Sequence, residues 1–101
     1  MLNKCSFIGN LTKDIDVKVL PDDTHIGNFR IAVNTKVGKN TDVLYLDCVM
    51  FGDRNKSISE FLVKGKQVYV DGRLKVTTRE FQETTYTNIS LIINDLYLLG
   101  R

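Results

Sequence analysis

The sequence predicts an all-β fold: a small barrel of five strands, with one short helix between the third and fourth strands. Five apolar or alternating runs are separated by turn residues, which is typical of a chain built from strands. Only one segment, shortly after Gly52, changes to the spacing of an amphipathic helix. A single helix among five strands argues against an alternating βαβ arrangement.

The first strand is expected over residues 2–11, with a bend or bulge at Gly9. Cys5, Phe7 and Leu11 should then point mostly inward. The extended path resumes over residues 15–20 and is broken by the polar turn that begins at Pro21.

The second strand is expected over residues 26–36, followed by a flexible loop over residues 37–42. The third strand covers residues 44–52, and its side chains alternate between two faces. The core face is expected to carry Leu44, Leu46, Cys48 and Met50. The other face would carry Tyr45, Asp47, Val49 and Phe51. Two aromatic rings beside a carboxylate are unusual for a face that only meets water, and rings on an open sheet can serve as platforms for unstacked bases.

The helix is predicted to begin at a capping box formed by Ser57 and Glu60. Ile58, Phe61 and Leu62 follow at helical spacing and would face the core, and the helix should close at residues 64–65.

The fourth strand is expected over residues 66–79, with a kink at Gly72. The predicted inward side chains are Val68, Val70, Leu74 and Val76. The predicted outward side chains are Gln67, Tyr69, Asp71, Arg73 and Lys75. Residues 78–85 show no apolar alternation and suggest a protruding hairpin loop. The fifth strand follows over residues 87–99, with a bulge or the end of pairing at Asn94 and Asp95. This order of elements is that of the OB-fold, a Greek-key barrel.

The 101 residues are expected to form one domain, with a composition typical of a soluble protein. No segment resembles a signal peptide or a membrane span, so we expect a cytoplasmic, nucleoid-associated protein. Cys5 and Cys48 occupy apolar strand positions and should be free thiols. No cofactor and no metal site are predicted, because the one histidine, His25, lacks nearby ligands.

The net charge of +2 is small, but its distribution is uneven. Residues 64–81 hold five basic and two acidic residues, whereas the rest of the chain holds nine basic and ten acidic residues. A local basic stripe is the pattern expected for phosphate contacts, although a solvated hairpin can look the same.

Several stretches together resemble bacterial single-stranded-DNA-binding proteins, in family order and over nearly the whole chain. These stretches are Asn-Lys-Cys-Ser-Phe-Ile-Gly-Asn-Leu at 3–11, Asn-Phe-Arg-Ile-Ala at 28–32, the aromatic-led strand ending in Phe-Gly at 45–52, and Phe-Leu-Val-Lys-Gly-Lys-Gln-Val-Tyr-Val-Asp-Gly-Arg-Leu at 61–74. The last is the most specific, because it specifies the helix end, a glycine and a strand register at once.

The resemblance implies a protein that coats transient single-stranded DNA in replication, recombination and repair, without strong sequence preference. It implies stacking on Tyr45 and Phe51, and a homotetramer assembled partly through the first strands, with a dimer as the alternative. The full set of predicted nucleic-acid contacts is Lys4, Lys18, Tyr45, Phe51, Lys64, Arg73, Lys75, Arg79 and Phe81.

The chain departs from the family pattern in four places. It has no tryptophan, and Val37 and Arg79 stand near usual stacking sites, with Phe81 as a substitute for the second. Asp47 lies on the expected binding face, where it would repel phosphate. The chain stops at Arg101 without the acidic tail through which family members recruit replication and repair enzymes. This predicts either a truncated chain or a short form of phage, plasmid or organelle type.

Two other functions remain open: a dimeric primosome-type OB protein that binds single strands and replication proteins, and an OB module for RNA or a protein ligand. An enzyme is the weakest candidate. The sequence offers no paired carboxylates on a shared face, no nucleophile elbow and no P-loop.

Overall fold

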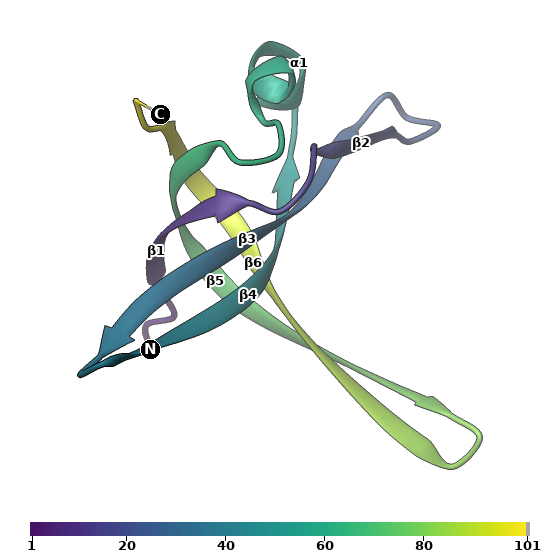
Figure 1. Ribbon diagram of the computed structural model, residues 1–101. Coiled ribbons are helices and arrows are strands. Elements are labelled where there is room, and N and C mark those ends of the chain that lie inside the picture. The colour runs from purple at the N-terminus through teal and green to yellow at the C-terminus, as the bar shows by residue number, and fades with distance from the viewer. Residues whose placement is uncertain (101) are drawn as a thin grey trace.

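The computed structural model describes residues 1–100, which fold into six strands around one barrel (Figure 1). The strands are β1 (Cys5–Leu11), β2 (Asp16–Val19), β3 (His25–Val37), β4 (Asn40–Phe51), β5 (Gln67–Phe81) and β6 (Thr84–Leu98). A short helix α1 (Arg54–Ile58) and a 3₁₀ turn η1 (Ser59–Phe61) connect β4 to β5.

The barrel closes through five of these strands. The hydrogen-bonded order is β1-β5-β6-β4-β3, and β3 returns to β1 through the pairs Asn10–Ala32 and Leu11–Ile31. The pairing of β4 with β6 is parallel and the others are antiparallel. The short β2 pairs with the first part of β3 and lies outside the closed circuit. The predicted five-stranded OB barrel with one short helix between its third and fourth strands is therefore confirmed.

The barrel interior holds a single apolar core. Its buried side chains are Leu11, Phe29, Ile31, Leu46, Cys48, Met50, Leu62, Val68, Val70, Leu91 and Ile93. Three of the four residues predicted for the core face of β4 are among them. The fourth, Leu44, is exposed because it lies where the β3–β4 hairpin extends past the barrel.

Both predicted hairpin tips are present, but the strands extend further into them than predicted, so each turn is shorter than the loops expected over residues 37–42 and 78–85. β3 and β4 are joined by a two-residue turn at Gly38 and Lys39, and β5 and β6 by a turn at Gln82 and Glu83. The β5–β6 hairpin projects from the barrel as a long arm (Figure 1). Both faces of such an arm meet water, so no apolar alternation marks its strands. Their signal is instead a high content of threonine, a β-branched residue that favours strands.

The arm also explains why the prediction that Val76 faces the core is wrong. Val76 is 59% exposed, because it lies on β5 beyond the end of the barrel, and its cross-strand partner Ile89 is exposed as well. Leu74, two residues nearer the barrel, is still partly buried against the core.

A bulge sits where the arm leaves the barrel. The register of β5 and β6 shifts between Asp71 and Gly72, which leaves Asn94 without a cross-strand partner and confirms the predicted bulge at Asn94 and Asp95. The prediction that Asp71 faces solvent is wrong, since only 7% of it is exposed. Its carboxylate accepts hydrogen bonds from the Tyr69 hydroxyl (2.9 Å) and the Asp95 backbone N–H (3.2 Å).

The helix begins earlier than predicted, and the capping box is wrong. Ser57 lies inside α1, where its hydroxyl donates to the carbonyl oxygen of Arg54 (3.1 Å) and caps nothing at the N-terminus. The start is determined instead by the fully buried Asn55, whose amide donates to the carbonyl oxygens of Met50 and Gly52, both at 2.9 Å.

The helical segment also ends sooner than predicted, at the end of η1 rather than at residues 64–65. Leu62 is fully buried and Ile58 is half-buried, as expected. Phe61 was expected to face the core, but it is 49% exposed, because the change to 3₁₀ geometry turns it outward.

Both cysteines are free thiols, as predicted. Among residues 1–100, no helix is long and apolar enough to cross a membrane, and no His, Cys, Asp and Glu side chains gather in a group suited to a metal ion.

Candidate nucleic-acid interface

The outer face of β4 carries the two rings that the sequence singled out. Tyr45 is 62% exposed and Phe51 is 47% exposed, while the alternating residues Leu46, Cys48 and Met50 fill the core. An unbroken register with β3, from residue 40 to residue 51, keeps this alternation intact. Both rings therefore stand on the same side of the sheet.

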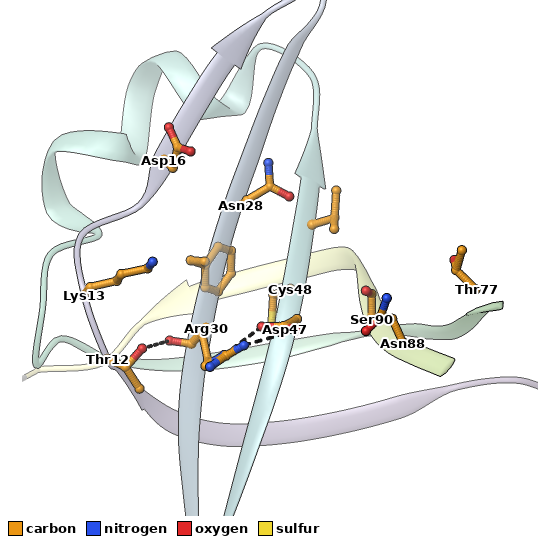
Figure 2. Close-up of a pocket in the computed structure, with 12 residues that line it drawn as sticks. Thr12, Lys13, Asp16, Asn28, Arg30, Asp47, Cys48, Thr77, Asn88 and Ser90 are labelled. Atoms are coloured by element: carbon orange, nitrogen blue, oxygen red, sulfur yellow. Dashed lines mark hydrogen bonds and ion pairs between the residues drawn. The ribbon is translucent and has the colours of Figure 1, made fainter. Parts of the chain in front are cut away.

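An open groove of about 710 Å³ lies on this side of the sheet, and its lining includes Asp47 and Val49, which stand between Tyr45 and Phe51 along β4 (Figure 2). Its floor comes from β3, β4 and β6, and its sides come from the start of β2 with the segment before it and from the arm. The lining residues are Thr12, Lys13, Asp16, Asn28, Phe29, Arg30, Asp47, Cys48, Val49, Thr77, Asn88 and Ser90. Most of them are polar, so the groove offers many hydrogen-bonding groups.

An ion pair occupies the middle of this floor. Arg30 Nε donates to Asp47 Oδ1 at 2.8 Å, and Nη2 approaches Oδ2 at 3.5 Å (Figure 2). This hydrogen bond, together with the charge of the carboxylate, raises the pKa of Arg30 above its usual value. Asp47 was expected to repel phosphate. Paired with Arg30, it leaves this part of the groove without net charge.

Cross-strand register places one predicted basic residue in line with the ion pair. Lys75 is the partner of Ser90 across β5 and β6, Ser90 is the partner of Asp47, and Asp47 is the partner of Arg30. Because directly paired residues share a face, these four side chains form one row across four strands. Lys75 thus lies on the groove face, next to the groove residue Ser90.

A second row places Lys18 with one of the rings. Lys18 of β2 pairs with Ile26 of β3, and Ile26 pairs with Phe51 of β4. All three therefore lie on the face that carries the groove. Lys18 is exposed, as a phosphate contact must be.

The arm continues the same face away from the barrel. Thr77, which lines the groove, is followed at every second position of β5 by Arg79 and Phe81, so the three side chains share one face. All three pair with residues of β6. Arg79 lies opposite Tyr86, an exposed ring that the sequence analysis did not single out. The arm therefore adds two rings and a guanidinium to the groove face.

Of the three remaining basic contacts, Arg73 pairs with Ile92 and Ile92 pairs with the groove residue Val49, so Arg73 also lies on the groove face, whereas Lys4 and Lys64 lie apart from it. Lys4 and Arg73 line a second, smaller hollow of about 370 Å³ beside Gly72. Lys64 follows η1, and its backbone N–H donates to Asp14 Oδ1 at 2.8 Å. All three are exposed, so they remain available to a strand that extends past the groove.

Most of the polar groove lining, above all Arg30, was not predicted from the sequence. One signal was available: Arg30 stands between Phe29 and Ile31, whose burial requires it to face outward. Its pairing with Asp47 could not be read from the sequence, because it depends on the register between two strands.

The chain is thus an OB barrel with an open groove, exposed rings and basic side chains along one face, features that OB domains for single-stranded nucleic acids share. Within that class, the chain belongs to the single-strand binding protein family, whose family model matches residues 2–99. The resemblance found in the sequence is thus confirmed.

The chain is similar to curated bacterial proteins of that kind. It is 30% identical over 98 residues to single-stranded DNA-binding protein 1 of Staphylococcus aureus (strain COL), covering 94% of this chain and 59% of the relative. It is 29% identical over 98 residues to the single-stranded DNA-binding protein of Oceanobacillus iheyensis, again covering 94% of this chain and 61% of the relative. The chain therefore spans about three fifths of the length of these relatives.

Among solved structures, a Plasmodium falciparum SSB complex with ssDNA superimposes with a TM-score of 0.89. The likeness covers 99% of this chain and 96% of the other, at 22% sequence identity. It shows that the two chains share a fold.

Proposed function

We propose that this protein binds single-stranded DNA without a strict sequence requirement, in the groove across β3, β4 and β6. The observation that carries the proposal is the exposure of Tyr45 and Phe51 on one face of β4, the face on which Asp47 and Val49 line an open polar groove. A half-exposed ring on the outside of a barrel gains nothing from the core. It is suited to stack an unstacked base, whatever that base is.

The binding mechanism combines stacking with phosphate contacts. Each base stacked on an aromatic ring contributes roughly 1–3 kcal/mol. Lys18, Lys75 and Arg79 stand on the same face as the rings and would neutralise phosphates along the strand. Arg79 can also stack through its guanidinium plane. Lys4, Lys64, Arg73 and Phe81 complete the proposed contacts.

Family membership supports the wider role: protection of transient single strands during replication, recombination and repair, in the cytoplasm and close to the nucleoid. The proposed assembly is a homotetramer that forms partly through β1, with a dimer as the alternative. Replication and repair enzymes would dock only if the full-length protein carries an acidic tail. No step in this role is chemical, so the protein would not act as an enzyme.

Multi-angle light scattering at several protein concentrations distinguishes tetramer from dimer.

The function is tested by fluorescence anisotropy with labelled oligo-dT, duplex DNA and RNA of equal length, each at two salt concentrations. We expect tight binding of oligo-dT, weaker binding of RNA and much weaker binding of the duplex, whose bases cannot reach the rings. Equal affinity for duplex and single strand would overturn the proposal. A clear preference for RNA would instead identify an RNA-binding OB module.

A further inference from the structure

The Arg30–Asp47 pair is an unusual feature for a groove that receives a polyanion. The two residues are direct cross-strand partners, and their side chains are 52% and 51% exposed. An ion pair this exposed contributes little to folding. Since its charges cancel, it also adds no attraction for phosphates. Neither stability nor phosphate binding therefore accounts for its place on the groove floor.

The pair does present hydrogen-bonding groups to a ligand. Nε of Arg30 donates a hydrogen bond to Asp47 Oδ1, while Nη2 lies 3.5 Å from Asp47 Oδ2. Within the described residues 1–100, Nη1 of Arg30 donates to no other group. Asp47 keeps unused lone pairs, because a carboxylate can accept about four hydrogen bonds. The floor of the groove thus offers a donor beside an acceptor, and the ion pair fixes their relative position.

Tyr45 stands at the right distance for this pair to meet a base. Tyr45 and Asp47 are two residues apart on the same face of β4, which places their Cα atoms about 7 Å apart. The cross-strand partner of Tyr45 is Ala32, whose small side chain leaves room beside the ring. The edge of a base stacked on Tyr45 can therefore lie over the Arg30–Asp47 pair.

Bases differ in how well their edges match a donor beside an acceptor. Cytosine presents its N4 amino group next to the acceptor N3, and a carboxylate accepting from N4 is a standard contact for reading cytosine. Thymine presents a carbonyl oxygen at the equivalent position, and its only donor, N3–H, lies between two carbonyl oxygens. A carboxylate beside thymine therefore meets at least one repelling oxygen.

We propose that Arg30 and Asp47 read the edge of the base stacked on Tyr45, and that they make this groove favour cytosine over thymine. The inference rests on the proposed function, since it needs a base on Tyr45, and it adds a base preference to it. Cytosine and thymine have rings of the same size, so stacking alone separates them little. The carboxylate supplies the difference.

The test compares oligo-dC with oligo-dT of equal length, by anisotropy, for the wild-type protein and for Asp47→Asn. This variant keeps the shape of the side chain but puts an amide donor where a carboxylate oxygen was. We expect the affinity ratio of dC to dT to fall about five-fold, the low end for a bidentate contact, because the pair is half exposed. Asp47→Ala should lower the same ratio, since it removes the acceptor altogether.

Asp42→Asn is the matched control. Asp42 is exposed on the same strand but on the opposite face, and the variant makes the same change in net charge. It should leave the dC-to-dT ratio unchanged, even if added positive charge strengthens binding to both. An unchanged ratio in both Asp47 variants, with strong binding to both oligonucleotides, overturns the base preference alone. Loss or absence of binding to both oligonucleotides by the wild-type protein overturns the proposed function itself.

Discussion

Tyr45 and Phe51 face water although large aromatic side chains are usually at least partly buried. Leaving apolar surface exposed costs roughly 25 cal/mol for each Å² that could have been removed from water. The alternating residues on β4 already fill the core, so the two rings are not needed there. This arrangement is consistent with a surface kept free for a ligand.

Replacing either ring by alanine should weaken binding of oligo-dT by roughly 1–3 kcal/mol, the contribution of one stacked base. Tyr45→Ala with Phe51→Ala should remove most of the binding, and the thermal midpoint should stay near that of the wild type because neither ring is buried. Phe61→Ala is the matched control, since Phe61 is as exposed as Phe51 but lies on η1. If the double variant binds oligo-dT as tightly as Phe61→Ala does, the stacking assignment is wrong.

The Cys48 side chain is buried in the core behind the groove floor, and the pKa of its thiol is raised. Burial, and after it the charge of Asp47, raises the pKa of the thiol from 9.0 to about 12. Between those values the folded protein keeps a proton that the unfolded chain releases. The free energy of unfolding should therefore fall as pH rises above about 9, by up to about 1.4 kcal/mol per pH unit.

Urea denaturation at pH 8 and pH 10 measures this effect, with Cys48→Ala for comparison. The variant should be less stable at both pH values because it leaves a cavity, but it should lose less stability between them. Tyrosine and lysine titrations are common to both proteins and cancel in the difference. Identical pH dependence in the two proteins would contradict the raised pKa.

At the scale of single residues, alternation predicted which side chains of β4 face the core and which face solvent. It worked from Leu46 to Met50, where one face of the unbroken strand is buried, and was wrong for Leu44, which lies beyond the barrel. It did not find the Arg30–Asp47 pair, because a contact between strands needs a register that no single strand contains. It also misjudged Asp71, which is covered by its neighbours Tyr69 and Asp95.

At the scale of elements, the strand order was predictable and the lengths of the hairpins were not. The parts of the strands inside the barrel carry apolar alternation. The ends of the β3–β4 and β5–β6 hairpins extend beyond the core and lack it. The helix start was missed because a buried side chain, Asn55, determines it through contacts with β4 that local capping rules do not contain.

The junction of barrel and arm depends on Gly72. A Cβ atom there would lie 1.9 Å from the backbone oxygen of Ile92, and a backbone atom cannot rotate aside. Gly72→Ala should therefore force the bulge apart and lower the free energy of unfolding by about 1–3 kcal/mol or more, the usual cost of overpacking.

Chemical denaturation of Gly72→Ala checks this cost. Gly100→Ala serves as the control, since nothing lies within 4 Å of the added atom at that position. Because the bulge directs the arm, Gly72→Ala should also weaken binding of oligo-dT at temperatures where it remains folded. A variant as stable as Gly100→Ala would show that the bulge tolerates a side chain.

At the scale of the whole molecule, the groove is made by the fold rather than by any one segment. Its lining runs from Thr12 to Ser90, and barrel closure brings these distant stretches together. The basic stripe read from residues 64–81 divides in three dimensions. Arg73, Lys75 and Arg79 share the groove face of β5, whereas Lys64 lies beside Asp14 after η1.

Salt dependence tests this division of charge. Each phosphate neutralised on a single strand contributes about −0.7 to the slope of log K against log salt concentration. Lys75→Ala and Arg79→Ala should each make the slope less steep by about 0.7, and together by about twice that amount. The measurement is a series of oligo-dT titrations from low to high salt.

Lys56→Ala makes the same change in charge on α1, where Lys56 approaches Asp53 at 3.6 Å, and it should leave the slope unaltered. A slope that moves equally in all three variants would mean that overall charge, rather than a strand held along the groove face, governs the affinity.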